Sequence, residues 1–209
     1  MFPLDVFKTI GYDAEYVAQK TYNGVATLSR HPMTVLSRNL MGDETDSHAR
    51  YLETTINDLR VINIYLPNGN PIGTERFEYK LAWMDRLKKR LVSLKKQNVP
   101  TVIGGDFNVI PEDIDCFSPK YWKKDALFQP EPREKFRELI KLGYIDAFRH
   151  FVKSLDTTHS GNISWIIGYT IAAFESITFW FHPHYKNVSP SVRSTRAHAD
   201  SRNLPITRL

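Results

Sequence analysis

Apolar and polar residues alternate along three stretches of the chain, which is the pattern of strands that bury one face. The third stretch ends at Tyr65. The pair Asn57-Asp58 lies between the second and third stretches and predicts a tight turn that joins them as a hairpin. A further apolar run closes with two glycines and predicts a buried strand that delivers Asp106 to the edge of a sheet. The predicted strands cover residues 22–30, 49–56, 61–65 and 102–106.

Helical spacing dominates a fifth stretch. Apolar residues recur at steps of three and four between residues 75 and 97, which predicts a long amphipathic helix. Its polar face is expected to carry the basic residues, Lys80 among them, and most of these are expected to be solvated. Two shorter helices, each closed by a glycine, are predicted over residues 1–12 and 132–142. A strand, a helix and a strand in succession predict a parallel crossover unit, and with it an α/β protein.

Polar residues stand where two of these strands end. Parallel strands finish at the same edge of a sheet, so Tyr65 and Asp106 are expected at neighbouring strand ends. Because side chains of a strand alternate between its faces, Asp106 and Asn108 are expected on one face and Phe107 on the other. A carboxylate and an amide oxygen together suit a hard cation or a phosphate-bound water. An ordinary strand end followed by an Asp/Asn turn explains the same residues and stays open.

Composition narrows the class of protein. The chain has 209 residues, 42% of them hydrophobic and 24% charged, as in one globular domain. No membrane span and no basic region followed by an apolar core are found, so a cytoplasmic location is expected. The net charge of +5, concentrated from Lys186 onward, is compatible with a polyanionic partner. Cys116 stands alone, which excludes an internal disulfide, and a metal site at His182 and His184 would need further ligands.

Two motifs carry a resemblance to a known family. Residues 64–69 read Ile-Tyr-Leu-Pro-Asn-Gly, and residues 104–108 read Gly-Gly-Asp-Phe-Asn. They resemble the exodeoxyribonuclease III family of the endonuclease/exonuclease/phosphatase superfamily, as do residues 144–149 and 163–165. The resemblance implies an α/β (α+β) fold, a partial four-layer α/β-sandwich with two sheets face to face and helices outside. It also implies a metal-dependent DNA-repair nuclease with 3′-to-5′ exonuclease and abasic-site endonuclease activity. Such a protein is expected to be a monomer that acts on double-stranded DNA and does not associate with a membrane.

The resemblance also assigns roles to single residues. It makes Tyr65, Asp106 and Asn108 catalytic, and it makes Asp106 and Asn108 ligands of Mg²⁺ or Mn²⁺. It places substrate contacts at four further positions, which are Arg50, Asn68, Lys80 and Trp165. For Arg50, a solvated charge on an edge strand is an alternative at least as strong.

The sequence departs from the family pattern at both ends. Two strands, one with an Asn and one with a metal-binding Glu, would precede the first helix, and an Asp-His pair would come near the end. Without these residues, the remaining ligands are expected to hold Mg²⁺ only weakly. We therefore expect an incomplete nuclease domain over residues 1–165, and over residues 166–209 a poorly ordered tail without family resemblance.

The genetic code offers an account of this tail. Read one base earlier, the codons of residues 172–178 can encode Gly-Leu-Arg-Ile-Asp-His, and those of residues 202–209 can encode Lys-Pro-Ser-Asp-His-Ala/Thr-Pro. Both are motifs of the family, so we expect a frameshift just after Trp165. Sequencing the gene tests this expectation, because the third bases of the tail codons must spell both motifs.

Two other functions stay open. Another phosphodiesterase or phosphatase of the superfamily, acting for example on a lipid or an inositol phosphate, would share the Gly-Asp-x-Asn motif. Alternatively, the chain is a non-catalytic remnant that binds DNA weakly through its basic helix and tail. Such a remnant would show a salt-sensitive, sequence-independent affinity without turnover.

Overall fold

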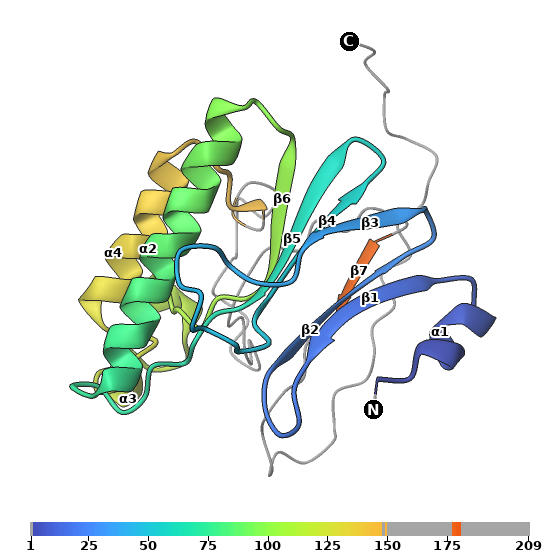
Figure 1. Ribbon diagram of the computed structural model, residues 1–209. Helices are drawn as coiled ribbons and strands as arrows, with labels where there is room; N and C mark the ends of the chain where they lie inside the picture. Colours follow the sequence, from blue (N-terminus) through green and yellow to red (C-terminus); the bar gives the residue numbers. More distant parts are fainter. Residues whose placement is uncertain (1, 148, 150–176, 181–209) are drawn as a thin grey trace, which may run out of the picture.

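Two β-sheets pack against each other, and helices cover the outer face of the larger sheet (Figure 1). The computed structural model describes residues 2–147, 149 and 177–180 of the chain. The smaller sheet is antiparallel with the strand order β1-β2-β7. Its strands are β1 (Asp13–Ala18), β2 (Gly24–Ser29) and β7 (Ile177–Trp180).

The larger sheet has the strand order β3-β4-β5-β6. Its first three strands pair antiparallel, whereas β5 and β6 run parallel. Asn63 of β5 reaches across to the smaller sheet and donates a hydrogen bond to the carbonyl oxygen of Ala26 on β2 at 2.7 Å. The strands are β3 (Met33–Ser37), β4 (Tyr51–Ile56), β5 (Leu59–Tyr65) and β6 (Thr101–Asp106).

Helix α2 (Glu75–Lys96) connects β5 to β6 and lies beside α4 (Pro130–Lys141) on the outer face of the larger sheet (Figure 1). Apolar residues of α2 and α4 form the main core with the sheet, and Trp83, Leu87 and Leu91 of α2 are almost fully buried there. The remaining helical segments are α1 (Leu4–Thr9) beside β1, the short 3₁₀ helix η1 (Asp113–Asp115) and α3 (Pro119–Trp122).

The predicted hairpin and the predicted crossover are both confirmed. Strands β4 and β5 are joined by the turn at Asn57, and α2 covers the predicted helix to within one residue. The helix predicted over residues 132–142 begins earlier, at Pro130, because the fixed φ angle of proline suits the first helical turn. The first predicted helix is the shorter α1. The chain therefore has the predicted α/β architecture of two sheets with outer helices.

Strands β1 and β3 were not predicted from the sequence. Strand β1 has no buried residue, and in the short strand β3 the adjacent hydrophobic residues Val35 and Leu36 break the alternation. Both strands owe their place to pairing with the neighbouring strands β2 and β4, which a local pattern does not reveal.

The prediction that Lys80 lies on the polar face of its helix was wrong, because Lys80 is 0% exposed. It lies three residues after Phe77 and four before Met84, and so on the apolar stripe of α2. The solvated edge-strand alternative for Arg50 was also wrong. Arg50 directly precedes β4, which is an internal strand between β3 and β5, and its side chain is partly buried.

Several expectations fall outside the part of the chain that the structure describes. They concern Trp165, His182, His184 and the boundary after residue 165. Strand β7 lies within the predicted tail and pairs with β2. Within the described residues, none of the helices combines the length and the apolar character that a membrane crossing requires.

A buried carboxylate joins the larger sheet to α2. Glu53 on β4 is 1% exposed and accepts hydrogen bonds from the Tyr51 hydroxyl at 2.5 Å and from Arg60 and Arg90. Burial raises the pKa of Glu53, but the hydrogen bonds from Arg90, Tyr51 and Arg60 outweigh burial and leave the pKa below its usual value of 4.5. The ionised form of Glu53 is therefore part of the folded structure.

We expect acid to destabilise the fold through Glu53. Because its pKa in the folded chain lies below the unfolded value of 4.5, its contribution is present above that pH and is lost as the pH falls through the folded pKa. Glu53→Gln should cost about 2 kcal/mol at neutral pH and remove this acid dependence. Urea unfolding at neutral and acid pH measures both effects.

The control for this prediction is Glu138→Gln, which removes a surface ion pair with Lys88 of 3.0 Å. It should change the free energy of unfolding by less than about 1 kcal/mol. An acid dependence in Glu53→Gln equal to that of the parent would contradict the assignment.

Candidate active site

Tyr65 and Asp106 stand side by side where two parallel strands end. They are register partners at the ends of β5 and β6, as the sequence predicted. Both line a cavity of about 540 Å³, whose other walls come from β2 and from apolar residues such as Phe2, Phe7 and Tyr16. This cavity places a phenol and a carboxylate together beside a largely apolar wall.

The chain leaves the sheet at Asp106 and turns at once. The Asn108 backbone N–H donates to Asp106 Oδ1 at 2.8 Å, and Asn108 has a φ angle of +45°, in the left-handed region that Asn tolerates. The Asn108 amide donates to the carbonyl oxygen of Leu66 at 2.7 Å and lies 3.5 Å from the Asn68 amide nitrogen. An Asx turn, and not strand alternation, therefore sets the position of Asn108.

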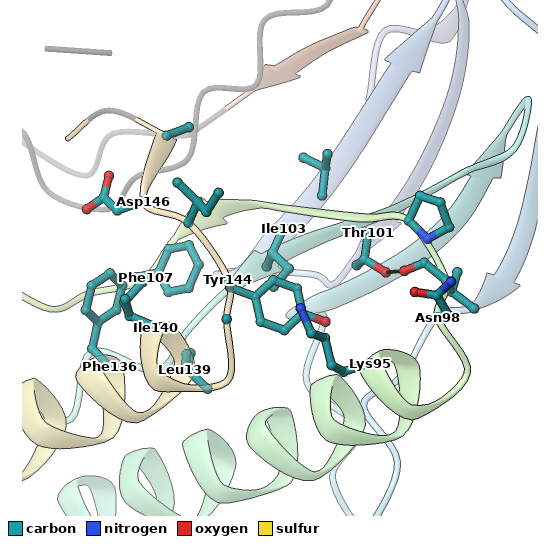
Figure 2. Close-up of a pocket in the computed structure, with 16 residues that line it drawn as sticks. Lys95, Asn98, Thr101, Ile103, Phe107, Phe136, Leu139, Ile140, Tyr144 and Asp146 are labelled. Carbon is teal, nitrogen blue, oxygen red and sulfur yellow. Dashed lines mark hydrogen bonds between the residues drawn. The ribbon is translucent and has the colours of Figure 1, made fainter. Parts of the chain in front are cut away.

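Phe107 points away from this cavity, as predicted. It is 4% exposed and meets Phe136 of α4 edge-on, with ring centroids 5.6 Å apart. Figure 2 shows it in a second cavity, of about 460 Å³, between β6 and the ends of α2 and α4. Ile103, Leu139 and Tyr144 line the same space. Asp106 and Phe107 thus serve opposite sides of the larger sheet, one the site and the other the core.

Burial shapes the acidity of both strand-end residues. It raises the pKa of Asp106 to about 6, against the opposing effects of the Asn108 N–H and the nearby Lys80 and Arg50 cations. Burial also raises the pKa of the Tyr65 phenol, and the charge of Asp106 adds to this effect. At neutral pH the pair therefore consists of a carboxylate and a neutral phenol, one able to accept a proton and the other to donate a hydrogen bond.

Arg50 lies next to Tyr65. Its guanidinium donates to the carbonyl oxygen of Tyr65 at 3.2 Å and lies over the Tyr65 ring, 5.1 Å from the centroid. Its Nε is buried and has no hydrogen-bond partner among the described residues. Burial lowers the pKa of Arg50, whereas Tyr79, Tyr65 and Asp46 oppose this. A buried side-chain donor without a hydrogen-bond partner is uncommon in folded proteins.

A second set of polar residues supports Arg50 and was not found from the sequence. Asp46 accepts hydrogen bonds from the Tyr79 hydroxyl on both carboxylate oxygens at 2.9 Å, from Arg86, and from His48 Nδ1 at 3.0 Å. Asp46 belongs to a polar loop between β3 and β4, which in the sequence resembles any solvated connection. Only contacts with α2, far along the chain, distinguish it.

The chain matches the endonuclease/exonuclease/phosphatase family over residues 3–203. Exodeoxyribonuclease III of Haemophilus influenzae is 30% identical over 175 residues, which cover 78% of this chain and 64% of that protein. An AP endonuclease from Archaeoglobus fulgidus superposes with a TM-score of 0.67 at 34% identity. The 3′ phosphatase NExo from Neisseria, bound to a product DNA hairpin, superposes with a TM-score of 0.68 at 31% identity. Both structural matches cover 71% of this chain and 58% of the other.

The chain belongs to the endonuclease/exonuclease/phosphatase family. It spans less than two thirds of the length of each of these three relatives, which are exodeoxyribonuclease III and AP endonuclease-type proteins. The two strand ends that carry the resemblance, at Tyr65 and Asp106, are those that the structure brings together.

Endonuclease/exonuclease/phosphatase family nucleases generally use divalent metals. In the part of the chain that the structure describes, no group of three or more His, Cys, Asp and Glu residues could hold a metal ion. Asp106 is the one carboxylate among the described residues that line the cavity, and the Asn108 amide is engaged with Leu66 and Asn68. These residues by themselves do not fit a divalent cation, which prefers several oxygen ligands.

The structure gives Lys80 a place that differs from the predicted substrate contact. Its ammonium group is enclosed by three backbone carbonyl oxygens, and burial lowers its pKa to about 7 despite the opposing charges of Asp125 and Asp106. A fully buried group with its donors engaged cannot reach a bound DNA strand. Asn68, by contrast, is exposed next to the Asp106–Asn108 turn, as a substrate contact requires.

Proposed function

We propose that this chain is a DNA-repair nuclease of the exodeoxyribonuclease III type, which hydrolyses phosphodiester bonds at abasic sites and from 3′ ends of double-stranded DNA. The observation that carries the proposal is the register pairing of Tyr65 with Asp106 in the wall of one cavity. The similarity to an exodeoxyribonuclease III and to an AP endonuclease supports the choice of substrate.

Each strand-end residue suits one task in phosphodiester hydrolysis. Asp106, with its pKa raised to about 6, is ionised at neutral pH but basic enough to take a proton from a water molecule or return one to the leaving group. The Tyr65 phenol, whose pKa is raised, stays protonated and can donate to a phosphate oxygen. The Asn108 turn fixes the carboxylate orientation through the bond to Asp106 Oδ1.

Mg²⁺ or Mn²⁺ is the ion predicted from the resemblance, and the assay below includes each in turn. The steps assigned here to Tyr65, Asp106 and Asn108 are proton transfer and hydrogen bonding, because the described ligand set does not itself fit a metal. The predicted cytoplasmic location and the predicted monomer remain predictions.

The test is cleavage of a duplex oligonucleotide that carries one abasic-site analogue, by the full chain with Mg²⁺ or Mn²⁺. Nicking at the analogue is the expected result. A soluble, cooperatively folded chain that binds the duplex but leaves it intact would overturn the proposal and favour the non-catalytic remnant.

A second candidate activity is removal of a 3′ phosphate from DNA. It is favoured by the similarity to a structure described as a 3′ phosphatase bound to product DNA. A duplex ending in a 3′ phosphate, assayed for released inorganic phosphate beside the abasic duplex, separates the two activities.

Arg50 supplies a prediction about DNA binding. Its guanidinium lies over the ring of Tyr65, one of the two strand-end residues of the site, and a guanidinium suits a phosphate oxygen of the bound strand. Arg50→Gln should weaken duplex binding about tenfold and lower the slope of log affinity against log salt by about one. Fluorescence anisotropy at several salt concentrations measures both values.

Lys141→Gln is the matched control for Arg50→Gln, since it also removes one positive charge, from an exposed ion pair on α4. It should leave the salt slope unchanged. If Arg50→Gln gives the same salt slope as the parent, then Arg50 contacts no phosphate.

A further inference from the structure

Lys80 is a lysine buried next to the Asp106–Asn108 turn. It has no exposed surface, and its ammonium nitrogen lies 3.0 Å from the carbonyl oxygen of Asn68, 2.5 Å from that of Asn108 and 3.4 Å from that of Ala126. An ammonium group has three N–H donors, so the three carbonyls engage all of them. Nothing of this side chain remains for a ligand.

The three carbonyls belong to three separate loops. Asn68 lies between β5 and α2, Asn108 follows β6, and Ala126 lies between α3 and α4. Asn70 also connects the first and third of these loops. Its Oδ1 accepts from the Ala126 N–H at 2.9 Å, and its Nδ2 donates to Asp125 at 3.0 Å. One side chain of α2 thus contacts three separate loops, one of which contains the Asp106 turn.

Direct hydrogen bonds also join these loops: the Asn108 amide donates to the carbonyl oxygen of Leu66 at 2.7 Å, and the Ile110 N–H donates to that of Leu127 at 2.8 Å. The amides of Asn68 and Asn108 are 3.5 Å apart, at the limit of a hydrogen bond. Bonds from a buried ammonium group are stronger, because the donor is charged and the surroundings have a low dielectric constant. Lys80 therefore adds a charged donor to the bonds that hold Asn108, whose N–H in turn orients Asp106.

Gly69 shows how closely the loop encloses this lysine. It has a φ angle of +88°, and a Cβ atom at Gly69 would lie 2.6 Å from Lys80 Cδ and 3.3 Å from the Ala126 Cβ. The left-handed backbone at Gly69 brings the Asn68 carbonyl and the lysine chain together, and another residue would displace one of them.

We propose that Lys80 is a positioning residue, which holds the loops of Asn68, Asn108 and Ala126 in one arrangement and so aligns Asn108 and Asp106. Its effect on catalysis rests on the proposed nuclease function, whereas its effect on the loops does not. Because misplacement of reacting groups by about 1 Å can cost on the order of 100-fold in rate, loss of these bonds should lower kcat by about that factor. KM should change little, because Lys80 does not touch the DNA.

The test compares Lys80→Met with Lys89→Met. Methionine keeps the length of the side chain and removes its donors, and Lys89 is an exposed lysine on the same helix. Hydrogen exchange is measured on peptides that cover residues 66–72, 106–110 and 124–128, together with kcat and KM on the abasic duplex. In Lys80→Met all three peptides should exchange faster together and kcat should fall, while Lys89→Met matches the parent.

A second variant covers the case in which Lys80→Met fails to fold. Gly69→Ala keeps the ammonium group but forces Lys80 Cδ aside, and it should accelerate exchange in the same three peptides. The positioning role would be overturned if the three peptides exchanged at the parent rate in a folded Lys80→Met or Gly69→Ala variant. It would also be overturned by a raised KM with an unchanged kcat. If the parent does not cleave DNA, the proposed function fails, and the exchange data alone decide the role of Lys80.

Discussion

Asp106→Asn should lower the rate of abasic-site cleavage by about 1000-fold, since a positioned general acid or base contributes about 100- to 10,000-fold. Asparagine has nearly the same shape and can still accept the Asn108 N–H bond of 2.8 Å, so the turn after β6 should survive. It cannot exchange a proton near neutral pH, which the carboxyl, with its pKa of about 6, can do. Single-turnover cleavage of the abasic duplex measures the effect.

The matched control is Asp113→Asn, an exposed carboxylate in the following loop that pairs with Arg133 at 2.9 Å. It should cleave at the parent rate. Duplex affinity should be unchanged or slightly higher in Asp106→Asn, because one negative charge leaves the site. A rate for Asp106→Asn within about threefold of the parent would show that the chemistry does not use this carboxylate.

Gly105→Ala should destabilise the fold by about 4 kcal/mol, because it combines backbone strain with a steric clash. Gly105 has a φ angle of +132°, and a Cβ atom there would lie 1.9 Å from the carbonyl oxygen of Ile64 on the neighbouring strand. The clash falls on the parallel β5–β6 pairing, next to the Tyr65 and Asp106 partners. Urea unfolding followed by circular dichroism measures the loss.

Gly73→Ala is the control that separates the cost of backbone strain from the cost of the steric clash at Gly105. Gly73 also has a left-handed φ angle, +73°, but a Cβ atom there would meet nothing within 4 Å. It should cost about 1 kcal/mol, the part that belongs to the backbone alone. Equal losses in the two variants would mean that the close approach of β5 and β6 at Gly105 does not limit stability.

Local spacing in the sequence was enough to predict the elements that carry the site. The hairpin of β4 and β5, the helix α2 and the strand β6 each repeat a pattern within a few residues. A strand, a helix and a strand in succession then require a parallel pair. This is why the neighbouring positions of Tyr65 and Asp106, and the opposite direction of Phe107, followed from the sequence alone.

The sequence did not reveal which polar side chains are buried. Lys80 and Glu53 look like ordinary charges of a helix and a strand, yet both are almost completely enclosed. Each is stabilised by partners far along the chain: carbonyls up to Ala126 for Lys80, and the guanidinium of Arg90 for Glu53. Burying a charge is costly unless it is paired, and the partners exist only in the folded chain.

The sequence by itself therefore determined the elements that carry the site, their order and the two residues at adjacent strand ends, because hydrophobic periodicity acts over short distances. Only the tertiary structure decided the conformation of the loops around them. It joined the Asn108 amide to the carbonyl oxygen of Leu66, set Arg50 beside Tyr65, and enclosed Lys80 between three loops. These arrangements depend on hydrogen bonds between distant segments, whose geometry is fixed only when the sheets and helices have packed.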